Sequence, residues 1–306
     1  RIKNLTALLG KFIHVRYLNL SHNDMEVLPN SITQVYNLQT LDLSYCDRLK
    51  ELTKNFSNLV NLEVVKLCGC RTLAFMPSGM SKLNNLYELS RFVVGVARPS
   101  SKQHGELESL KALNKLRGYI EIVIHFPISD VLATHNTIKE GGYLRDKEQL
   151  DTIDFDCKHE DGSEEAADYE EELLGALQPH GNLKVLSLRG YQGVKMPKWA
   201  IEDYLTSFFP KLVQFNLHGC CELECLPSLR KLQNLKYLSL SHLAKLEYLE
   251  TPPETISEHS EASGEGVKFF PSLEQLTLGN LPKLKEWWSR SGERMGWGER
   301  IRSREP

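Results

Sequence analysis

The stretch Tyr36-Asn-Leu-Gln-Thr-Leu-Asp-Leu-Ser-Tyr-Cys46 decides the fold, because its apolar positions return along the chain at near-constant intervals. The same spacing of apolar residues appears one step earlier in Leu18-x-Leu20-x-x-Asn23 and one step later in Val65-x-Leu67-x-x-Cys70. The two steps measure 23 and 24 residues. A repeat of this kind must be settled before any single helix or strand is assigned.

Further copies of the phrase extend over most of the 306 residues. Good copies begin at Leu183, Leu212, Leu235 and Leu273, and weaker ones lie at Leu86, around Ile120 and at Leu150. They fit the leucine-rich-repeat template L-x-x-L-x-L-x-x-N/C-x-L, and together they predict about ten turns.

The side-chain period of a strand explains the pattern, because alternate residues face opposite sides. The leucines of each L-x-L core point inward, and the cores of successive turns pair into a parallel sheet. The convex side is closed by apolar residues, and prolines on the same side disfavour long helices. The apolar residues are Leu28, Leu52, Met76 and Leu226, and the prolines are Pro29, Pro77, Pro197 and Pro227. We therefore predict an α/β fold, a leucine-rich-repeat solenoid curved like a horseshoe, with its parallel β-sheet on the concave face.

The spacing between copies divides the chain into four parts. We predict regular repeats over 1–95, irregular repeats with insertions and an acidic loop over 96–182, further repeats over 183–288, and a non-repeat tail over 289–306. The stretch 151–172 holds eleven acidic residues and one lysine, which favours a solvated mobile loop leading into a helix at about 170–177. The alternative is a contact with a basic partner. The stretch 251–266 also favours a flexible loop.

Charge and cysteine usage narrow the classes of partner. A net charge of −3 and an isoelectric point near 6.4 exclude a dominant basic surface, so we expect no nucleic-acid partner. Seven cysteines without paired spacing favour a reducing compartment. Asn23, Cys46, Cys70 and Cys220 occupy the turn after a strand, where we expect small buried side chains and free thiols rather than a zinc site.

No stretch is long and apolar enough for a membrane span, and the first residues do not resemble a secretion signal. The chain begins at Arg1 rather than Met, which indicates a piece of a longer protein. A calcium loop at Asp154-x-Asp156 is rejected because His159 stands where a glycine is needed. We therefore predict no metal in this chain.

Enzyme motifs are also missing from the sequence. There is no H-E-x-x-H pair, no G-x-S-x-G elbow and no G-x-x-x-x-G-K-[ST] phosphate loop. Paired carboxylates occur in the acidic loop, where we expect water to leave their acidity unperturbed. The sequence predicts a binding protein, not an enzyme.

Binding is expected on the outward residues of the concave strands. Tyr17, Arg189, His218 and Tyr237 are the expected sources of affinity, because aromatic and arginine side chains dominate protein interfaces. The same alternation also places Val64 and Ser90 on this face. The complete predicted partner-binding set is Tyr17, Asn19, Ser21, Thr40, Asp42, Ser44, Lys66, Glu88, Arg189, Gln214, Asn216, His218, Tyr237, Ser239, Gln275 and Thr277. For Trp199 we expect a role as a core or convex-face filler.

Several phrases resemble the repeat domain of plant disease-resistance proteins of the nucleotide-binding leucine-rich-repeat family, coiled-coil subclass. Besides the stretch 36–46, they are Leu89-Ser-Arg-Phe-Val-Val-Gly95, Leu113-x-x-Leu116-Arg-Gly118, Leu177-Gln-Pro-His180-x-Asn-Leu183 and Met196-Pro-x-Trp199. The chain departs from the family pattern at Thr53, where proline is usual, and in the tail 287–306.

The resemblance implies a region that senses a pathogen effector, directly or through a guarded host protein. It also implies an intramolecular contact that holds an attached nucleotide-binding module inactive. No cofactor is expected in this chain, and ADP or ATP is expected only in that module. The implied location is cytoplasmic, or nuclear or membrane-peripheral as part of a longer protein.

Two other functions use the same fold. One is the substrate-recognition arm of an F-box ubiquitin ligase, which the sequence upstream of Arg1 would distinguish from a receptor. The other is a cell-surface receptor ectodomain, for which Asn4, Asn19 and Asn55 would be glycosylation sites. The odd number of cysteines argues against this last alternative.

Overall fold

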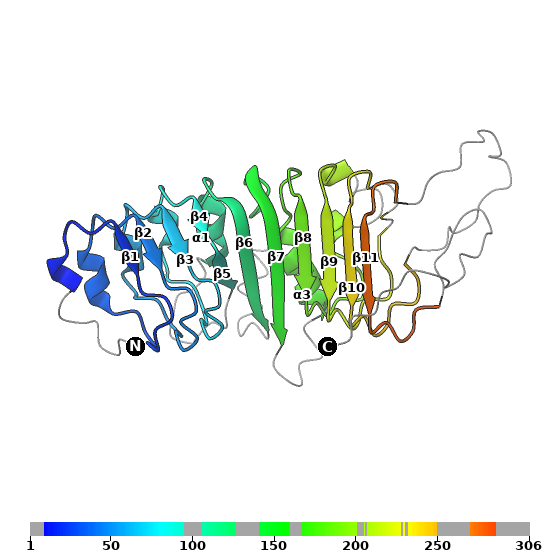
Figure 1. Cartoon of the computed structure of the whole chain (residues 1–306), viewed down its shortest axis with the longest axis horizontal. Helices are drawn as coiled ribbons and strands as arrows, with labels where there is room; N and C mark the ends of the chain where they lie inside the picture. The colour runs from blue at the N-terminus through cyan, green and yellow to red at the C-terminus, as the bar shows by residue number, and fades with distance from the viewer. Residues whose placement is uncertain are drawn as a thin grey trace.

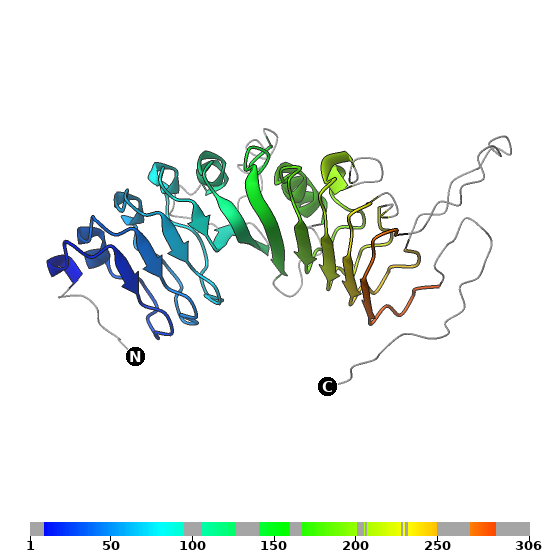
Figure 2. The same cartoon turned by 45° about the horizontal axis from the view of Figure 1, so that its top comes forward.

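The chain forms a solenoid of ten successive turns, seen in a computed structural model that describes residues 9–94, 106–126, 141–159, 167–200, 205, 207–227, 229, 232–249 and 270–285. Figure 2 shows an arc whose inner side is lined by strands and whose outer side carries the helical segments. The predicted horseshoe with a parallel concave sheet and about ten repeats is confirmed.

The strands form two parallel sheets in chain order (Figure 1). The first sheet contains β1 (Tyr17–Asn19), β2 (Thr40–Asp42), β3 (Val64–Lys66) and β4 (Glu88–Leu89). The second contains β5 (Arg91–Val94), β6 (Arg117–Phe126), β7 (Gln149–His159), β8 (Val185–Arg189), β9 (Gln214–His218), β10 (Tyr237–Ser241) and β11 (Gln275–Gly279).

The outer side is built from short helices, as the convex prolines predicted. Two α-helices are described, α1 (Glu106–Ala112) and α3 (Ala167–Ala176). The 3-10 segments are η1 (Leu9–Lys11), η2 (Asn30–Gln34), η3 (Phe56–Asn58), η4 (Met80–Lys82) and η6 (Lys198–Ala200).

The core is one continuous apolar strip from Leu9 to Phe270. Aligned positions of the repeats face one another across the sheets, as in the pairs Leu18 with Leu41 and Leu186 with Phe215. The convex closing residues Leu28, Leu52, Met76 and Leu226 are all at most 3% exposed. Trp199 is buried as expected, and its indole Nε1 donates to the Leu174 carbonyl at 2.6 Å.

Small side chains close the turns after β1, β2, β3 and β9, and the predicted burial is confirmed for the three cysteines, whereas Asn23 is only half-buried. The Cys46 thiol donates to the Leu20 carbonyl at 3.2 Å, and the Cys70 thiol donates to the Leu43 carbonyl at 3.1 Å. Cys220 makes the equivalent contact with Leu188 at 3.6 Å. Each thiol thus ties its own turn to the preceding one.

An asparagine ladder on the rim opposite these turns was not foreseen. Asn37, Asn61, Asn182 and Asn234 each precede the first leucine of a repeat. Their side-chain amides donate to backbone carbonyls of the preceding turn at 2.6 to 3.0 Å. Because the pattern Asn-Leu-x-x-Leu recurs in the sequence, the signal for this ladder was present.

The two sheets separate at Ser90, between β4 and β5. Leu89 and Phe92 both point inward, with two residues between them. The Leu-x-Leu spacing has one residue there, so this turn contains one residue more. The Ser90 hydroxyl accepts from the Leu67 backbone N–H at 2.7 Å, in the place where earlier turns use a backbone carbonyl. One inserted residue therefore ends the first sheet and starts the second.

The prediction of an exposed acidic loop is corrected for its first part. Residues 151–159 of the predicted acidic loop belong to the long strand β7, because Ile153, Phe155 and Cys157 alternate inward and bind it to the core. The helix predicted at about 170–177 is α3, which begins earlier, at Ala167. Residues 160–166, the loop 251–266 and the tail 289–306 lie outside the described residues.

Ser44, Val64 and Ser90 were predicted to face outward but are 9%, 7% and 6% exposed. Ser44 follows the end of β2, and its backbone groups are engaged by His22 and Asp42, which leaves its small side chain covered. Val64 lies in register between Thr40 and Glu88, whose strands cover it on both sides. Ser90 is turned toward Leu67 by the break between the sheets.

Candidate recognition surface

The concave face carries the predicted partner-binding residues on neighbouring strands. Register places Tyr17, Thr40 and Glu88 in one row of the first sheet, and Gln214, Tyr237 and Gln275 in one row of the second. With the exception of Ser44, all sixteen residues of that set are partly or fully exposed. The structure therefore gathers them on one surface, and their part in binding stays a prediction.

The middle of this face is a network of paired charges across β5, β6, β7 and β8. The Arg189 guanidinium lies 2.9 Å from a Glu121 carboxylate oxygen and 2.8 Å from an Asp154 carboxylate oxygen. The other Glu121 oxygen lies 3.2 Å from Arg91, which is 7% exposed at its side chain. A second pair joins Lys158 to Asp156 at 3.0 Å. We call Arg91, Glu121, Asp154 and Arg189 the central network.

Burial in the central network changes acidity. Desolvation raises the pKa of Asp154 to about 6, in opposition to the attraction of Arg189, which lowers it. Burial works to lower the pKa of Arg189, but the surrounding carboxylates Asp154, Asp156 and Glu121 outweigh it and raise that pKa. Burial also raises the pKa of the neighbouring Tyr119. The expectation that water leaves these carboxylates unperturbed is wrong for Asp154.

Sequence reasoning found only Arg189 of the central network. The other three residues lie in the irregular repeats, where the weaker leucine pattern hid the strand register. A signal existed in Ile120-Glu-Ile122 and Ile153-Asp-Phe155, because a charge between two inward residues must face outward.

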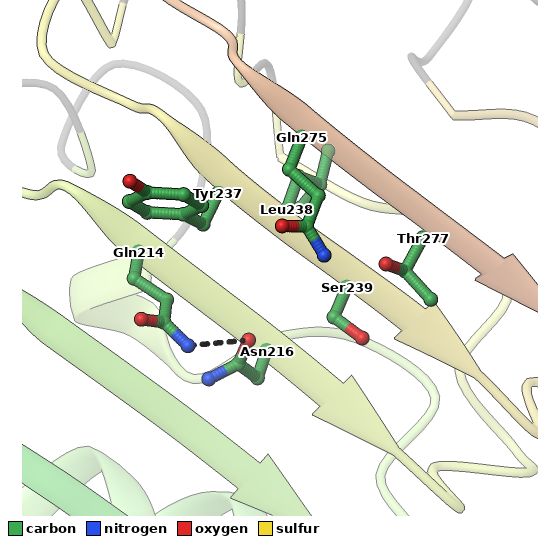
Figure 3. A pocket seen from close by; sticks show the side chains of 7 residues that line it. All are labelled: Gln214, Asn216, Tyr237, Leu238, Ser239, Gln275 and Thr277. Atoms are coloured by element: carbon green, nitrogen blue, oxygen red, sulfur yellow. Dashed lines mark hydrogen bonds between the residues drawn. The ribbon is translucent and has the colours of Figure 1, made fainter.

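The C-terminal part of the concave face forms an open hollow of about 390 Å³. Figure 3 shows its lining, in which side chains from β9, β10 and β11 point toward the same space. The lining residues are Gln214, Asn216, Tyr237, Leu238, Ser239, Gln275 and Thr277. Six of the seven belong to the partner-binding set predicted from the sequence, and Leu238 is the addition.

The N-terminal part of the face is more open. Tyr17 is 59% exposed. The Asn19 side-chain oxygen accepts from the Ser21 backbone N–H at 2.8 Å. At the rim, the rings of His22 and Tyr45 stack with their centroids 4.9 Å apart. These aromatic rings border the face at the end where β1 and β2 lie.

A cluster of ionisable side chains is buried behind β7. Glu170 of α3 is fully buried, accepts from the Gln192 backbone N–H at 3.2 Å and lies 3.5 Å from His159. Burial raises the pKa of the adjacent Cys157 thiol well above its usual range. A thiol held in its neutral form is a poor nucleophile, so this cluster packs α3 against the sheet.

In the described part of the chain, no three His, Cys, Asp or Glu side chains come together in a way that could hold a metal ion. Nor does any helix described in the structure reach the length and apolarity needed to cross a bilayer.

Parallel strands on the concave side, a leucine core and short convex helices define the class of leucine-rich-repeat proteins. The sequence pattern of the R13L1/DRL21 leucine-rich repeats matches residues 107–243. The chain is therefore a leucine-rich-repeat domain of the plant disease-resistance type, as its relatives also show.

Among those relatives, the putative disease resistance protein RGA1 of Solanum bulbocastanum is 33% identical over 89% of this chain and 30% of its own length. The putative disease resistance RPP13-like protein 1 of Arabidopsis thaliana is 32% identical over 90% of this chain and 25% of its own length. The chain thus spans less than a third of the proteins that it resembles.

Solved structures show a more distant likeness. The leucine-rich-repeat ectodomain of the receptor kinase GASSHO1/SCHENGEN3 from Arabidopsis thaliana is 15% identical, with a TM-score of 0.41. The match covers 79% of this chain and 29% of the receptor chain.

Proposed function

We propose that this chain is the recognition region of an immune receptor, which binds a pathogen effector directly or through a guarded host protein. In the same proposal it restrains an attached nucleotide-binding module, which would hold ADP or ATP. The chain acts by binding and not by catalysis, and it works in the cytoplasm. The observation that carries the proposal is the similarity to disease-resistance proteins over about nine-tenths of the chain.

The concave face supports this proposal physically. Its exposed residues come from every turn, so a partner can touch residues that are far apart in the sequence. Repeat proteins use such curved surfaces to bind other macromolecules. Lys66 in β3 and Arg189 in β8 place a cationic side chain on each sheet, and Arg189 is paired with Glu121 and Asp154.

A cell-death assay tests the proposal in the full-length receptor that contains this chain. We expect Lys66→Glu or Arg189→Glu to abolish effector-triggered death, or to cause death without effector, because each reverses a charge on the contact face. Lys82→Glu is the matched control, since Lys82 is an exposed lysine of the 3-10 segment η4, outside the concave strands. If both concave variants keep wild-type recognition and wild-type restraint, the proposal is wrong.

A further inference from the structure

The wall formed by β9, β10 and β11 differs from the rest of the concave face in its chemistry. Its outward side chains are amides, hydroxyls, one tyrosine and one histidine, without a carboxylate, lysine or arginine. They are Gln214, Asn216, His218, Tyr237, Ser239, Ser241, Gln275 and Thr277. The neighbouring central network, in contrast, is made of full charges that neutralise one another.

Several polar side chains in the hollow have no hydrogen-bond partner among the described residues. The Gln214 amide donates to Asn216 at 3.3 Å, and Asn216 donates to Ser187 at 2.9 Å. The side chains of Ser239, Gln275 and Thr277 make no hydrogen bond with any other described residue, and they face the same space in Figure 3. A ligand that enters this space meets donors and acceptors that are already free.

We propose that this hollow binds a short, extended and uncharged peptide segment of the recognised protein. The inference rests on the proposed function and assigns the chemistry of one contact within it. Each carboxamide offers a donor and an acceptor, which is the complement of one peptide group. A charged side chain would lose water here without meeting an opposite charge, which costs free energy.

Tyr237 supplies the apolar part of the contact. Its ring lines the hollow at the β10 position, and its hydroxyl donates to a Glu274 carboxylate oxygen at 3.3 Å. That hydrogen bond restricts the ring, so little conformational entropy is lost when a partner packs on it. Tyrosines held in this way are frequent anchors of protein interfaces.

The size of the hollow sets the length of the segment. Three strands at about 4.8 Å spacing place the outward side chains over about 10 Å, which an extended chain covers with about three residues. The volume of about 390 Å³ lies at the lower end of the range of about 300–1,000 Å³ for ligand pockets. The contact is therefore a short stretch of main chain and not a folded surface.

Selection from a random-peptide phage library against the immobilised chain tests the inference. We expect selected peptides to lack charge clusters and to lose less than about twofold in affinity between low and high salt, because screening acts on charges. Gln275→Ala and Thr277→Ala should each weaken them by about 3–10-fold, the value of one hydrogen bond. Thr33→Ala, the same change in the 3-10 segment η2 and outside the concave strands, should leave affinity unchanged.

Several outcomes would overturn the inference. They are the absence of any selected peptide, selected peptides that are charged and respond to Arg189→Glu, and peptides that do not respond to Thr277→Ala. Binding to an oligosaccharide array that Thr277→Ala abolishes would assign the hollow to sugars instead. Thermal melting shows whether each variant is folded. None of these results decides the proposed function, which the cell-death assay tests separately.

Discussion

The position of Asp154 in the sheet determines the pKa of its carboxyl group. In the sequence it belongs to an acidic run, where water would be expected around every carboxylate. In the structure it lies on β7 between Glu121 and Ser187 in register, with Arg189 against one of its oxygens. Desolvation outweighs the attraction of Arg189, and the pKa rises from 3.8 to about 6.

This raised pKa predicts a dependence of stability on pH. The folded state binds the Asp154 proton more tightly than the unfolded state, so the contribution of this residue grows as pH falls from about 6 toward about 4. Urea unfolding of the wild type and of Asp154→Asn at pH 7 and at pH 4.5 measures it. We expect the free energy of unfolding of the wild type, relative to the variant, to be larger at pH 4.5. An equal difference at both pH values would contradict the assignment.

At the scale of the element, the break between β4 and β5 depends on one hydroxyl. The inserted residue moves the backbone carbonyls away from Leu67. Without another acceptor, the Leu67 N–H would be buried and unsatisfied. Ser90 fills that place with its side chain. The family resemblance of the phrase Leu89–Gly95 marked this region, but neither the break nor the role of Ser90 followed from it.

Ser90→Ala should therefore cost about 1–3 kcal/mol of stability, because it leaves a buried N–H unsatisfied. The matched control is Ser44→Ala, a serine that is also buried but whose hydroxyl bonds to none of the described residues. Chemical denaturation of both variants measures the difference. Equal losses would show that the Ser90 hydroxyl is not the acceptor on which the turn depends.

At the scale of the whole molecule, Arg91 connects the two sheets. One of its guanidinium nitrogens donates to the Cys70 carbonyl, in the turn that follows β3, at 3.3 Å. Another lies 3.2 Å from Glu121 on β6 of the second sheet. Since β4 and β5 are joined through Ser90 alone, this side chain adds a contact between the turn after β3 and strand β6.

Arg91→Met should loosen this junction. We expect a loss of about 1–3 kcal/mol, since Glu121 keeps its second partner Arg189 while the Cys70 carbonyl loses its donor. Amide hydrogen exchange should become faster in β3, β4 and β6 and stay unchanged in β10 and β11. Arg117→Met, at an exposed arginine over the Tyr87 ring, is the control. An equal increase in exchange rate in all described strands would contradict a local role of Arg91.

The predicted repeat and its register are confirmed, because equivalent residues of successive turns must stack on one another. Each regular turn repeats the same inward residues, so Leu41 and Val65 can occupy only equivalent places in a shared core. The sixteen outward residues followed from the same alternation, and fifteen of them are partly or fully exposed. Ser44 failed because exposure at the end of a strand depends on the path of the chain after it.

The sequence by itself determined the solenoid, the concave sheet and most of its outward residues, because these follow from a period that is local to each turn. Tertiary structure alone decided the break at Ser90, the central network and the uncharged hollow. These depend on which side chains from distant turns become neighbours, and on how much water that closeness removes. Insertions of unequal length make that register impossible to count along the chain, so it emerges only when the turns are stacked.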